Sequence, residues 1–218
     1  MITYKLSFST ENQNIFWVSD LHYNHDRDFI WGAPGRNYKN VREMNEHIIQ
    51  SWNETITEDD IVFHLGDIIF NDFDGTRLLD LFSKLRFKQL YCVFGNHTSG
   101  ERHVYKELMR EIGFPDKEMF PLDLSVTDTK KVTYIGYHAD IEINGQYIVL
   151  NHYPITSWNK IRRKSWMIHG HTHCNLKHTS GLKTIDIGWD YQRKPVSFQE
   201  LQSYMSKKTS VSAGDHHK

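Results

Sequence analysis

The sequence predicts an α/β protein with two β layers, and three observations lead to this prediction. The first half alternates buried apolar segments with amphipathic ones, an order typical of parallel strands with helices on the sheet. The second half is rich in β-forming residues and contains Asn144-Gly145, which favours a type I′ hairpin turn. A length of 218 residues fits about one domain, so we expect one domain over residues 1–206 and a disordered polar tail over residues 207–218.

Three short apolar segments in the first half are expected to form buried strands that end in polar residues. They are residues 15–18, 61–65 and 90–94. Asn40, followed by Glu43, is typical of a helix N-terminus, and an apolar face continues from there to Trp52. Further helices are expected around residues 78–85 and 104–112.

The second half is expected to contribute mainly strands. They are residues 132–137, 141–143, 147–150, 166–168 and 184–188. Ser197, with Glu200 three residues later, predicts a capped helix that continues to Tyr204. Together the two halves predict two β layers within one α/β domain.

The composition disfavours several classes of function. Lys and Arg number 26 and Asp and Glu number 27, so the net charge of −1 gives no general attraction for nucleic acid or anionic membranes. The sequence contains no apolar run of about 18 residues and no signal-peptide pattern at its start. Two cysteines, Cys92 and Cys174, fit a reducing compartment. We therefore expect a cytoplasmic protein. The basic run at residues 160–164 is expected either to be a solvated part of the surface or to attract an anionic substrate.

Side chains that can bind metals follow five of the predicted strands. They are Asp20 with His22, Asp67, Asn96 with His97, His152, and His171 with His173. The carboxyl ends of strands in an α/β sheet border the crevice where ligands bind, so we expect these side chains to meet there. Each pair two residues apart would point the same way from an extended backbone. Imidazole and oxygen ligands, too many for one tetrahedral zinc, favour two ions such as Mn²⁺, Fe or Zn²⁺.

The ordered motifs resemble those of the calcineurin-like metallophosphoesterases, and in particular the small bacterial and phage members. The motifs are Asp20-Leu21-His22, Gly66-Asp67, Gly95-Asn96-His97, His152 and Gly170-His171-Thr172-His173. The resemblance implies a four-layer αββα sandwich with mixed sheets and a dinuclear metal site at the C-terminal ends of the strands. It also implies a metal-dependent hydrolase of phosphomonoester or phosphodiester bonds that uses two divalent ions, foremost Mn²⁺, with Fe, Ni or Zn²⁺ as alternatives.

The resemblance further implies a role for each residue of the site. One ion would be held by Asp20, His22 and His173, the other by Asn96, His152 and His171, and Asp67 would lie between them. A hydroxide bridging the ions would attack phosphorus, and His97 would assist the leaving group. Two positions depart from the family's pattern: Thr98 replaces an acid that often follows the Asn-His pair, and Phe70 replaces an Asp or Asn in the second motif.

Three loop residues are further candidates. His25 and Arg36 are candidate substrate contacts, each with an ordinary loop role as the alternative, and Asp190 either supports the site or caps a turn. The expected partner is a small phosphorylated substrate such as a nucleotide, rather than a membrane or a nucleic acid. A nuclease of the same superfamily and a non-catalytic metal-binding scaffold are the alternative functions. The net charge disfavours the first, and the presence of His97 disfavours the second.

Overall fold

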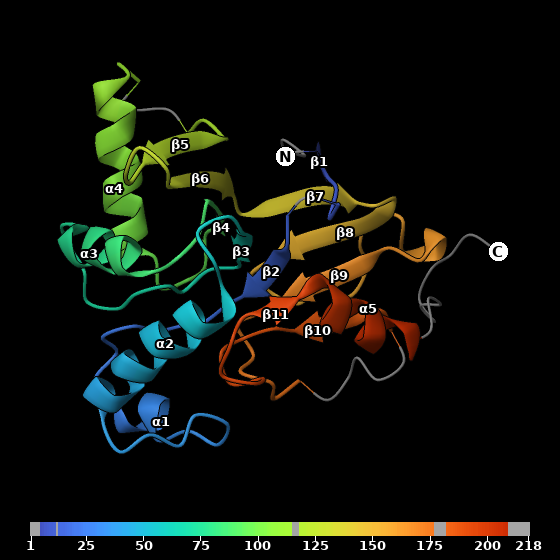
Figure 1. The fold of residues 1–218 in the computed structure, drawn as a ribbon, viewed down its shortest axis with the longest axis horizontal. Helices are drawn as coiled ribbons and strands as arrows, with labels where there is room; N and C mark the ends of the chain where they lie inside the picture. Colours follow the sequence, from blue (N-terminus) through green and yellow to red (C-terminus); the bar gives the residue numbers. More distant parts are fainter. Residues whose placement is uncertain (1–4, 12, 115–117, 177–181, 209–218) are drawn as a thin grey trace.

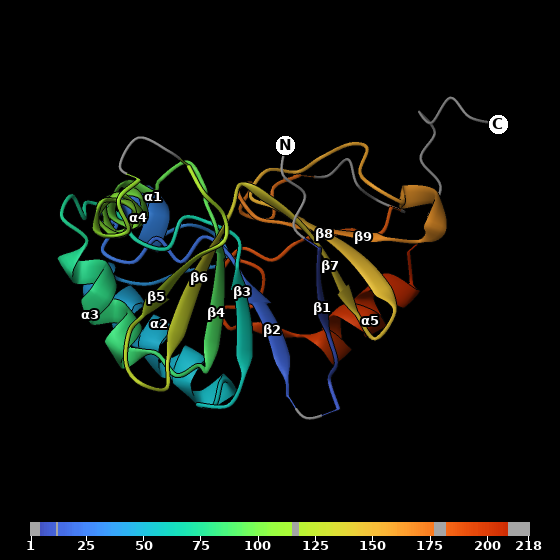
Figure 2. The same ribbon diagram turned by 90° about the horizontal axis from the view of Figure 1, so that it is seen from above.

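The computed structural model describes residues 5–11, 13–114, 118–176 and 182–208. The strands form two sheets that pack face to face, and helices α1 to α4 lie on the side of the larger sheet that faces away from the smaller one (Figure 1, Figure 2). This arrangement confirms the predicted α/β sandwich with mixed sheets. The predicted disordered tail lies, from residue 209 onward, outside the described residues.

The larger sheet has six strands in the order β11-β2-β3-β4-β6-β5. Strands β2, β3 and β4 are parallel, as the alternating pattern of the first half predicted. Strand β6, from the second half of the chain, adds to them in parallel, and the antiparallel strands β11 and β5 form the two edges. The strands are β2 (Ile15–Val18), β3 (Ile61–His64), β4 (Gln89–Val93), β5 (Leu122–Ser125), β6 (Lys131–Gly136) and β11 (Val196–Ser197).

The smaller sheet has five strands in the order β1-β7-β8-β9-β10. They are β1 (Lys5–Phe8), β7 (His138–Ile143), β8 (Gln146–Asn151), β9 (Trp166–His169) and β10 (Thr184–Asp186). Strands β7 and β8 form an antiparallel hairpin, and the remaining pairs are parallel. The hairpin turn has φ values of 48° at Asn144 and 80° at Gly145, which confirms the predicted left-handed turn.

The helices expected from Asn40, around residues 78–85 and after Ser197 lie close to their predicted positions. The helix expected around residues 104–112 begins earlier, at Ser99, and the short helices at residues 28–31 and 161–163 were not expected. The helices are α1 (Asp28–Trp31), α2 (Val41–Thr55), α3 (Thr76–Lys84), α4 (Ser99–Glu111), the 3₁₀-helix η1 (Ile161–Arg163) and α5 (Phe198–Ser206). The Asn40 side chain accepts a hydrogen bond from the Glu43 N–H (2.9 Å), and Ser197 with Glu200 forms a complete capping box. Of the helices in the described ranges, none has both the length and the apolar character needed to cross a membrane.

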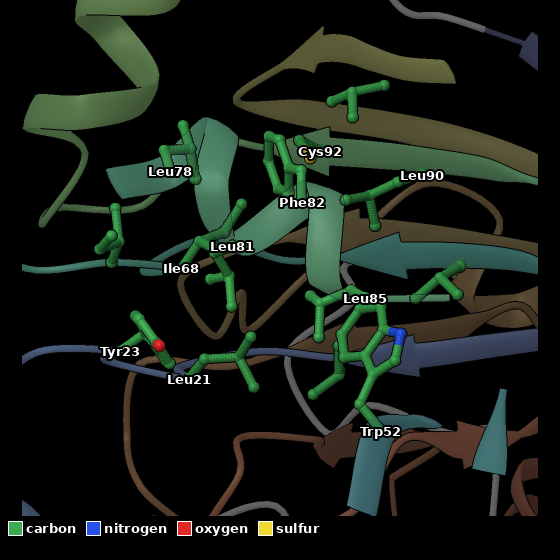
Figure 3. Packing of buried hydrophobic residues seen from close by; sticks show 14 of the residues in the cluster. Leu21, Tyr23, Trp52, Ile68, Leu78, Leu81, Phe82, Leu85, Leu90 and Cys92 are labelled. Carbon is green, nitrogen blue, oxygen red and sulfur yellow. The ribbon is translucent and has the colours of Figure 1, made fainter. Parts of the chain in front are cut away.

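One hydrophobic core lies between the larger sheet and its helices. Leu78, Leu81 and Phe82 of α3 are fully buried there. Figure 3 shows them in the same cluster as Trp52 of α2 and Leu90 of β4. This packing uses the apolar face that the periodicity of the sequence defines.

A second core lies between the two sheets. Trp17 of β2 stacks on Phe63 of β3 with ring centroids 5.6 Å apart, and Ile148 of β8 belongs to the same cluster. Phe198 of α5 contacts Trp17 and closes this core beside β11. Across the smaller sheet, a separate cluster that contains Ile161 of η1 covers the outer face. Within the described ranges, the fourth layer is therefore a short segment rather than a set of long helices.

Candidate metal centre

The loops that follow β2, β3, β8 and β9 run side by side at one end of the sandwich. The main-chain N–H of Asp20 donates to the carbonyl of Gly66 (3.0 Å), which joins the loops after β2 and β3. The N–H of Gly170 donates to the carbonyl of His152 (3.0 Å), which joins the loops after β8 and β9. The polar residues at the strand ends thus lie next to one another in each sheet, as predicted.

The two sheets are also joined to each other at this end. The N–H of Ser19 donates to the carbonyl of Ile187 (3.2 Å), and the N–H of Trp189 donates to the carbonyl of Ser19 (2.8 Å). Gly170 lies so close to this junction that a Cβ atom there would overlap the side chains of Ser19 and Asp20. Only glycine therefore allows the loop after β9 to approach the loop after β2.

The backbone at five of the seven predicted ligands is left-handed rather than extended. φ is 54° at Asp20, 50° at His22, 58° at Asp67, 69° at His171 and 48° at His173. The extended backbone that we expected for the two pairs is therefore not found, and His171 and His173 enter different clusters. Residues other than glycine rarely adopt such φ values, and clusters of them are typical of functional sites.

A first group of ligands consists of Asp20, His22 and His173. One donor atom from each lies within 4.8 Å of the others. Asp20 Oδ1 and His22 Nε2 are buried and have no hydrogen-bond partner in the described part of the chain. A buried acceptor without a partner is costly, and a cation would satisfy both of these lone pairs. The residues of the first group therefore fit a metal ion.

The pKa values of Asp20 and His22 fit the same conclusion. Burial raises the pKa of Asp20 from 3.8 to about 8, because an isolated carboxylate is poorly stabilised in the interior. Burial also lowers the pKa of His22 well below its ordinary value, so its imidazole is neutral and keeps a free lone pair. A divalent cation beside both groups would favour the ionised carboxylate and the neutral imidazole, which are the forms that bind metal.

The two histidines of this group are oriented through their other ring nitrogen. His173 Nδ1 lies 2.8 Å from Asp190 Oδ2, and His22 Nδ1 lies 3.2 Å from His25 Nδ1. Burial works against the charge of Asp190, but its bonds with His173 and Arg36 outweigh this effect and lower its pKa. Such partners leave Nε2 of each histidine for the ion, as is common at metal sites. His25 and Asp190 thus contact the predicted ligands from the side of Nδ1, and His25 also lines the cavity described below, so its expected contact with substrate stays a prediction.

Arg36 lies behind the site and not in it. Its side chain is fully buried, and its Nε and Nη2 donate to the two carboxylate oxygens of Asp190 (3.1 and 3.0 Å). Its guanidinium also donates to the carbonyls of Asp20 (2.5 Å) and Leu21 (3.0 Å). The expected contact between Arg36 and substrate does not match this placement, because the donors are engaged within the protein. Asp190 contacts both Arg36 and His173, which favours the supporting role over a turn cap.

A second group consists of Asn96, His152 and His171. Asn96 Oδ1 lies 2.8 Å from His152 Nε2 and 2.9 Å from His171 Nδ1. Asp67 Oδ2 lies 3.5 Å from His152 Nε2 and 3.8 Å from His22 Nε2, so this carboxylate stands between the two groups. Donor atoms of Asp20, Asp67 and His152 also lie within 4.8 Å of one another, which brings Asp20 close to the second group as well.

A cavity of about 620 Å³ opens beside both groups. His97 lines it with an exposed side chain, and its main-chain N–H donates to Asp67 Oδ1 (2.7 Å).

The two residues that depart from the pattern of the similar family, Thr98 and Phe70, both contact neighbouring side chains. Thr98 is buried and accepts a hydrogen bond from Arg102, while Phe70 stacks on His25 with ring centroids 3.6 Å apart.

Two supporting carboxyl groups were not among the residues that we singled out from the sequence. Asp186 accepts hydrogen bonds from Thr172 Oγ1 (2.5 Å) and from the Cys174 N–H (3.1 Å), and so holds the loop after β9. Glu101 of α4 accepts from the Ile68 N–H (3.2 Å), next to Asp67. Asp186 was missed because the predicted strand continued to residue 188 and placed it in the middle, whereas the observed strand β10 ends at Asp186.

The fold and the ligand groups define a metal-binding α/β sandwich protein, and the comparisons with known proteins give its family. Residues 14–188 match the family model described as the calcineurin-like phosphoesterase superfamily domain, and the chain belongs to this family. Its members are in general metal-dependent phosphoesterases.

Several relatives are similar over most of the chain. An uncharacterised protein of Methanocaldococcus jannaschii is 28% identical over 163 residues, which are 75% of this chain and 71% of that protein. The Gene 66 protein of Mycobacterium phage D29 is 24% identical over 212 residues, covering 88% of this chain and 96% of its own. The crystal structure of a protein of unknown function from Aquifex aeolicus has a TM-score of 0.60 and 20% identity, covering 88% of this chain and all of that one. This last likeness supports the fold alone.

Proposed function

We propose that the protein hydrolyses phosphomonoester or phosphodiester bonds with two divalent ions bound at this centre. The observation that carries the proposal is the convergence of seven oxygen and imidazole ligands from five loops beside an open cavity. The ligands are Asp20, His22, Asp67, Asn96, His152, His171 and His173. Mn²⁺ is the proposed metal, because hard oxygen ligands and imidazoles occur without a thiolate, and Fe, Ni and Zn²⁺ are the alternatives to be tested.

The residues of the chain have distinct tasks in this proposal. Two bound cations would supply Lewis-acid stabilisation of the phosphoryl oxygens and a more acidic water molecule. His25 and Asp190 orient two of the ligands, so the centre needs little rearrangement when it binds substrate. His97 faces the cavity, and an N–H of its imidazole would give a proton to the ester oxygen that leaves phosphorus.

The test combines activity with metal content. The purified protein is assayed with aryl phosphate monoesters and diesters in the presence of Mn²⁺, Ni²⁺, Co²⁺, Fe²⁺ or Zn²⁺. We expect hydrolysis with at least one of these ions, and a complete lack of hydrolysis with all of them would refute the proposal.

The role of His97 is tested by substitution. His97→Ala should reduce turnover by about 10²- to 10⁴-fold while two ions per chain remain bound. His103→Ala is the matched control, because His103 is a half-exposed histidine of α4 outside the cavity. Unchanged turnover in His97→Ala would assign the proton transfer to another group.

A further inference from the structure

We propose that the cavity contains a subsite for a flat aromatic ring at Phe29, so that the substrate is a phosphate ester of a ring-bearing alcohol. This inference deepens the proposed function and depends on it for the position of the phosphate. It begins from an apolar side chain in an unusual place: Phe29 of α1 is 67% exposed and lines the cavity next to the metal centre.

The wall around Phe29 is apolar. Ile30, Ala33 and Pro34 line the same cavity from the same segment of chain, and predicted ligands line another part of it. A cavity lined partly by polar metal-binding side chains and partly by apolar ones fits a ligand that has both a charged and an apolar part. A small hydrophilic phosphate ester would leave the apolar wall in contact with water, so a ring-bearing ester is the better match.

A series of ring contacts connects the metal centre to Phe29. The rings of His22 and His25 have centroids 5.2 Å apart, and those of His25 and Phe29 have centroids 6.0 Å apart at an angle of 80°. Phe29 therefore lies one ring beyond the residue that orients a predicted ligand. A phosphate bound at the ions would direct its ester group along this wall, within reach of the exposed face of Phe29.

The cavity has the size and the polar rim that such a substrate needs. Its volume of about 620 Å³ exceeds that of a phosphate group alone and falls in the ordinary range of small-molecule sites. Arg27 and Asn175 also line it, and they can donate hydrogen bonds to heteroatoms of the ring. A nucleoside and a simple aryl group share the flat ring, and the experiment separates these two sources.

The experiment compares substrates with and without a ring. Wild type, Phe29→Ala and Phe29→Trp are assayed with a nucleoside monophosphate, phenyl phosphate and glycerol phosphate. Each variant is compared with wild type on the same substrate, so differences in intrinsic reactivity cancel. Phe73→Ala is the matched control, because Phe73 is 76% exposed and is not among the residues that line the cavity.

We expect Phe29→Ala to raise KM about 5- to 100-fold for the ring-bearing substrates and to leave glycerol phosphate unchanged. Phe29→Trp should restore the low KM, because tryptophan presents an equivalent flat face. A larger rise in KM for the nucleoside monophosphate than for phenyl phosphate would identify a nucleoside as the natural group. Equal rises in KM for the two substrates would identify a simple aryl group. Equal effects of Phe29→Ala on all three substrates, or the same effects in Phe73→Ala, would overturn the proposal.

A binding measurement keeps this test separate from that of the proposed function. Calorimetry with Mn²⁺-loaded protein compares benzylphosphonate, which the protein cannot hydrolyse as an ester, with methylphosphonate. Tighter binding of benzylphosphonate to wild type, lost in Phe29→Ala, supports the subsite even if no ester is hydrolysed. Equal binding of the two phosphonates would overturn the subsite even if hydrolysis is found.

Discussion

The two groups of candidate metal ligands are held in place by different means. In the first group, Nδ1 of His22 and Nδ1 of His173 contact His25 and Asp190. Asp190 in turn forms a buried two-point ion pair with Arg36. Side chains thus orient the first group, and each of them can be changed by mutation.

The second group depends more on the main chain. His152 Nδ1 lies 2.8 Å from the carbonyl oxygen of Leu65, and Asn96 is exposed at the cavity. The nearby loop is fixed by Glu101, a buried carboxyl group with one oxygen bonded to the Ile68 N–H and the other without a partner in the described residues. The comparison indicates that the buried Arg36–Asp190 ion pair supports the first group, whereas Glu101, an acid whose pKa is raised by burial, supports the loop beside the second group. Mutations should therefore affect the two groups separately.

The largest expected effect concerns the ion pair. Asp190→Ala leaves the Arg36 charge buried without its partner, so the free energy of unfolding of the metal-free protein should fall by about 3–5 kcal/mol in urea denaturation. Asp80→Ala removes a partner from the exposed Lys84–Asp80 pair and should cost much less. The double variant Arg36→Met, Asp190→Leu should recover part of the loss. Equal losses in the two single variants would contradict a special role for the buried pair.

The next effect concerns metal affinity in the first group alone. His25→Ala removes the partner of His22 Nδ1, and we expect the affinity for one ion to fall about 10- to 100-fold while the other affinity is unchanged. Titration of the metal-free protein with Mn²⁺ measures both affinities, and His103→Ala provides the control. An equal fall in the affinities for both ions would show that the two groups are not separately supported.

The third effect concerns Glu101 and the pH dependence of the free energy of unfolding. Burial raises the pKa of Glu101 from 4.5 to about 8, so the folded protein keeps a proton that the unfolded chain releases. The contribution of Glu101 to the free energy of unfolding should therefore fall as pH rises from about 4.5 to 8, by at most about 1.4 kcal/mol per unit. Glu101→Gln removes this contribution, so the free energy of unfolding of the variant should fall less steeply, or rise more steeply, with pH than that of wild type. The raised pKa of Asp20 acts in the same direction as that of Glu101, and the lowered pKa values of His22 and His64 act in the opposite direction in both proteins. Denaturation of metal-free protein across this pH range gives the slope, and an unchanged slope would contradict the assignment.

The smallest effect lies outside the site and serves as a reference. Asn40→Ala removes the side chain that caps α2 and should lower the free energy of unfolding by about 1 kcal/mol. Both metal affinities should stay at their wild-type values. A change in either affinity would show that general destabilisation alone alters the centre.

The sequence predicted the parts of the fold that local patterns determine. Strands β2, β3 and β4 follow from apolar runs, the α2 and α5 caps from residues three positions apart, and the hairpin from Asn144-Gly145. The convergence of the predicted ligands follows from one rule, because the carboxyl ends of neighbouring parallel strands share an edge. Their roles in binding ions and in catalysis stay predictions.

Features that depend on distant partners could not be predicted in this way. Strand β1 is only four residues long and pairs with β7, more than a hundred residues later. Arg36 reads as an ordinary loop residue, because its partner Asp190 is 154 positions away. The left-handed backbone at the ligands was also missed, since residues such as His22 carry no local signal for positive φ.

The junction between Ser19 and Gly188 has a consequence for biosynthesis. The first group joins side chains that are far apart in the sequence: Asp20 accepts a hydrogen bond from His171, and Arg36 from the same early segment binds Asp190. A nascent chain on the ribosome that has not yet exposed His173 lacks one of the three candidate ligands of this group, and one that has not yet exposed Asp190 lacks the partner of Arg36. The proposed ion could therefore not be held by this group in chains whose synthesis stops before His173.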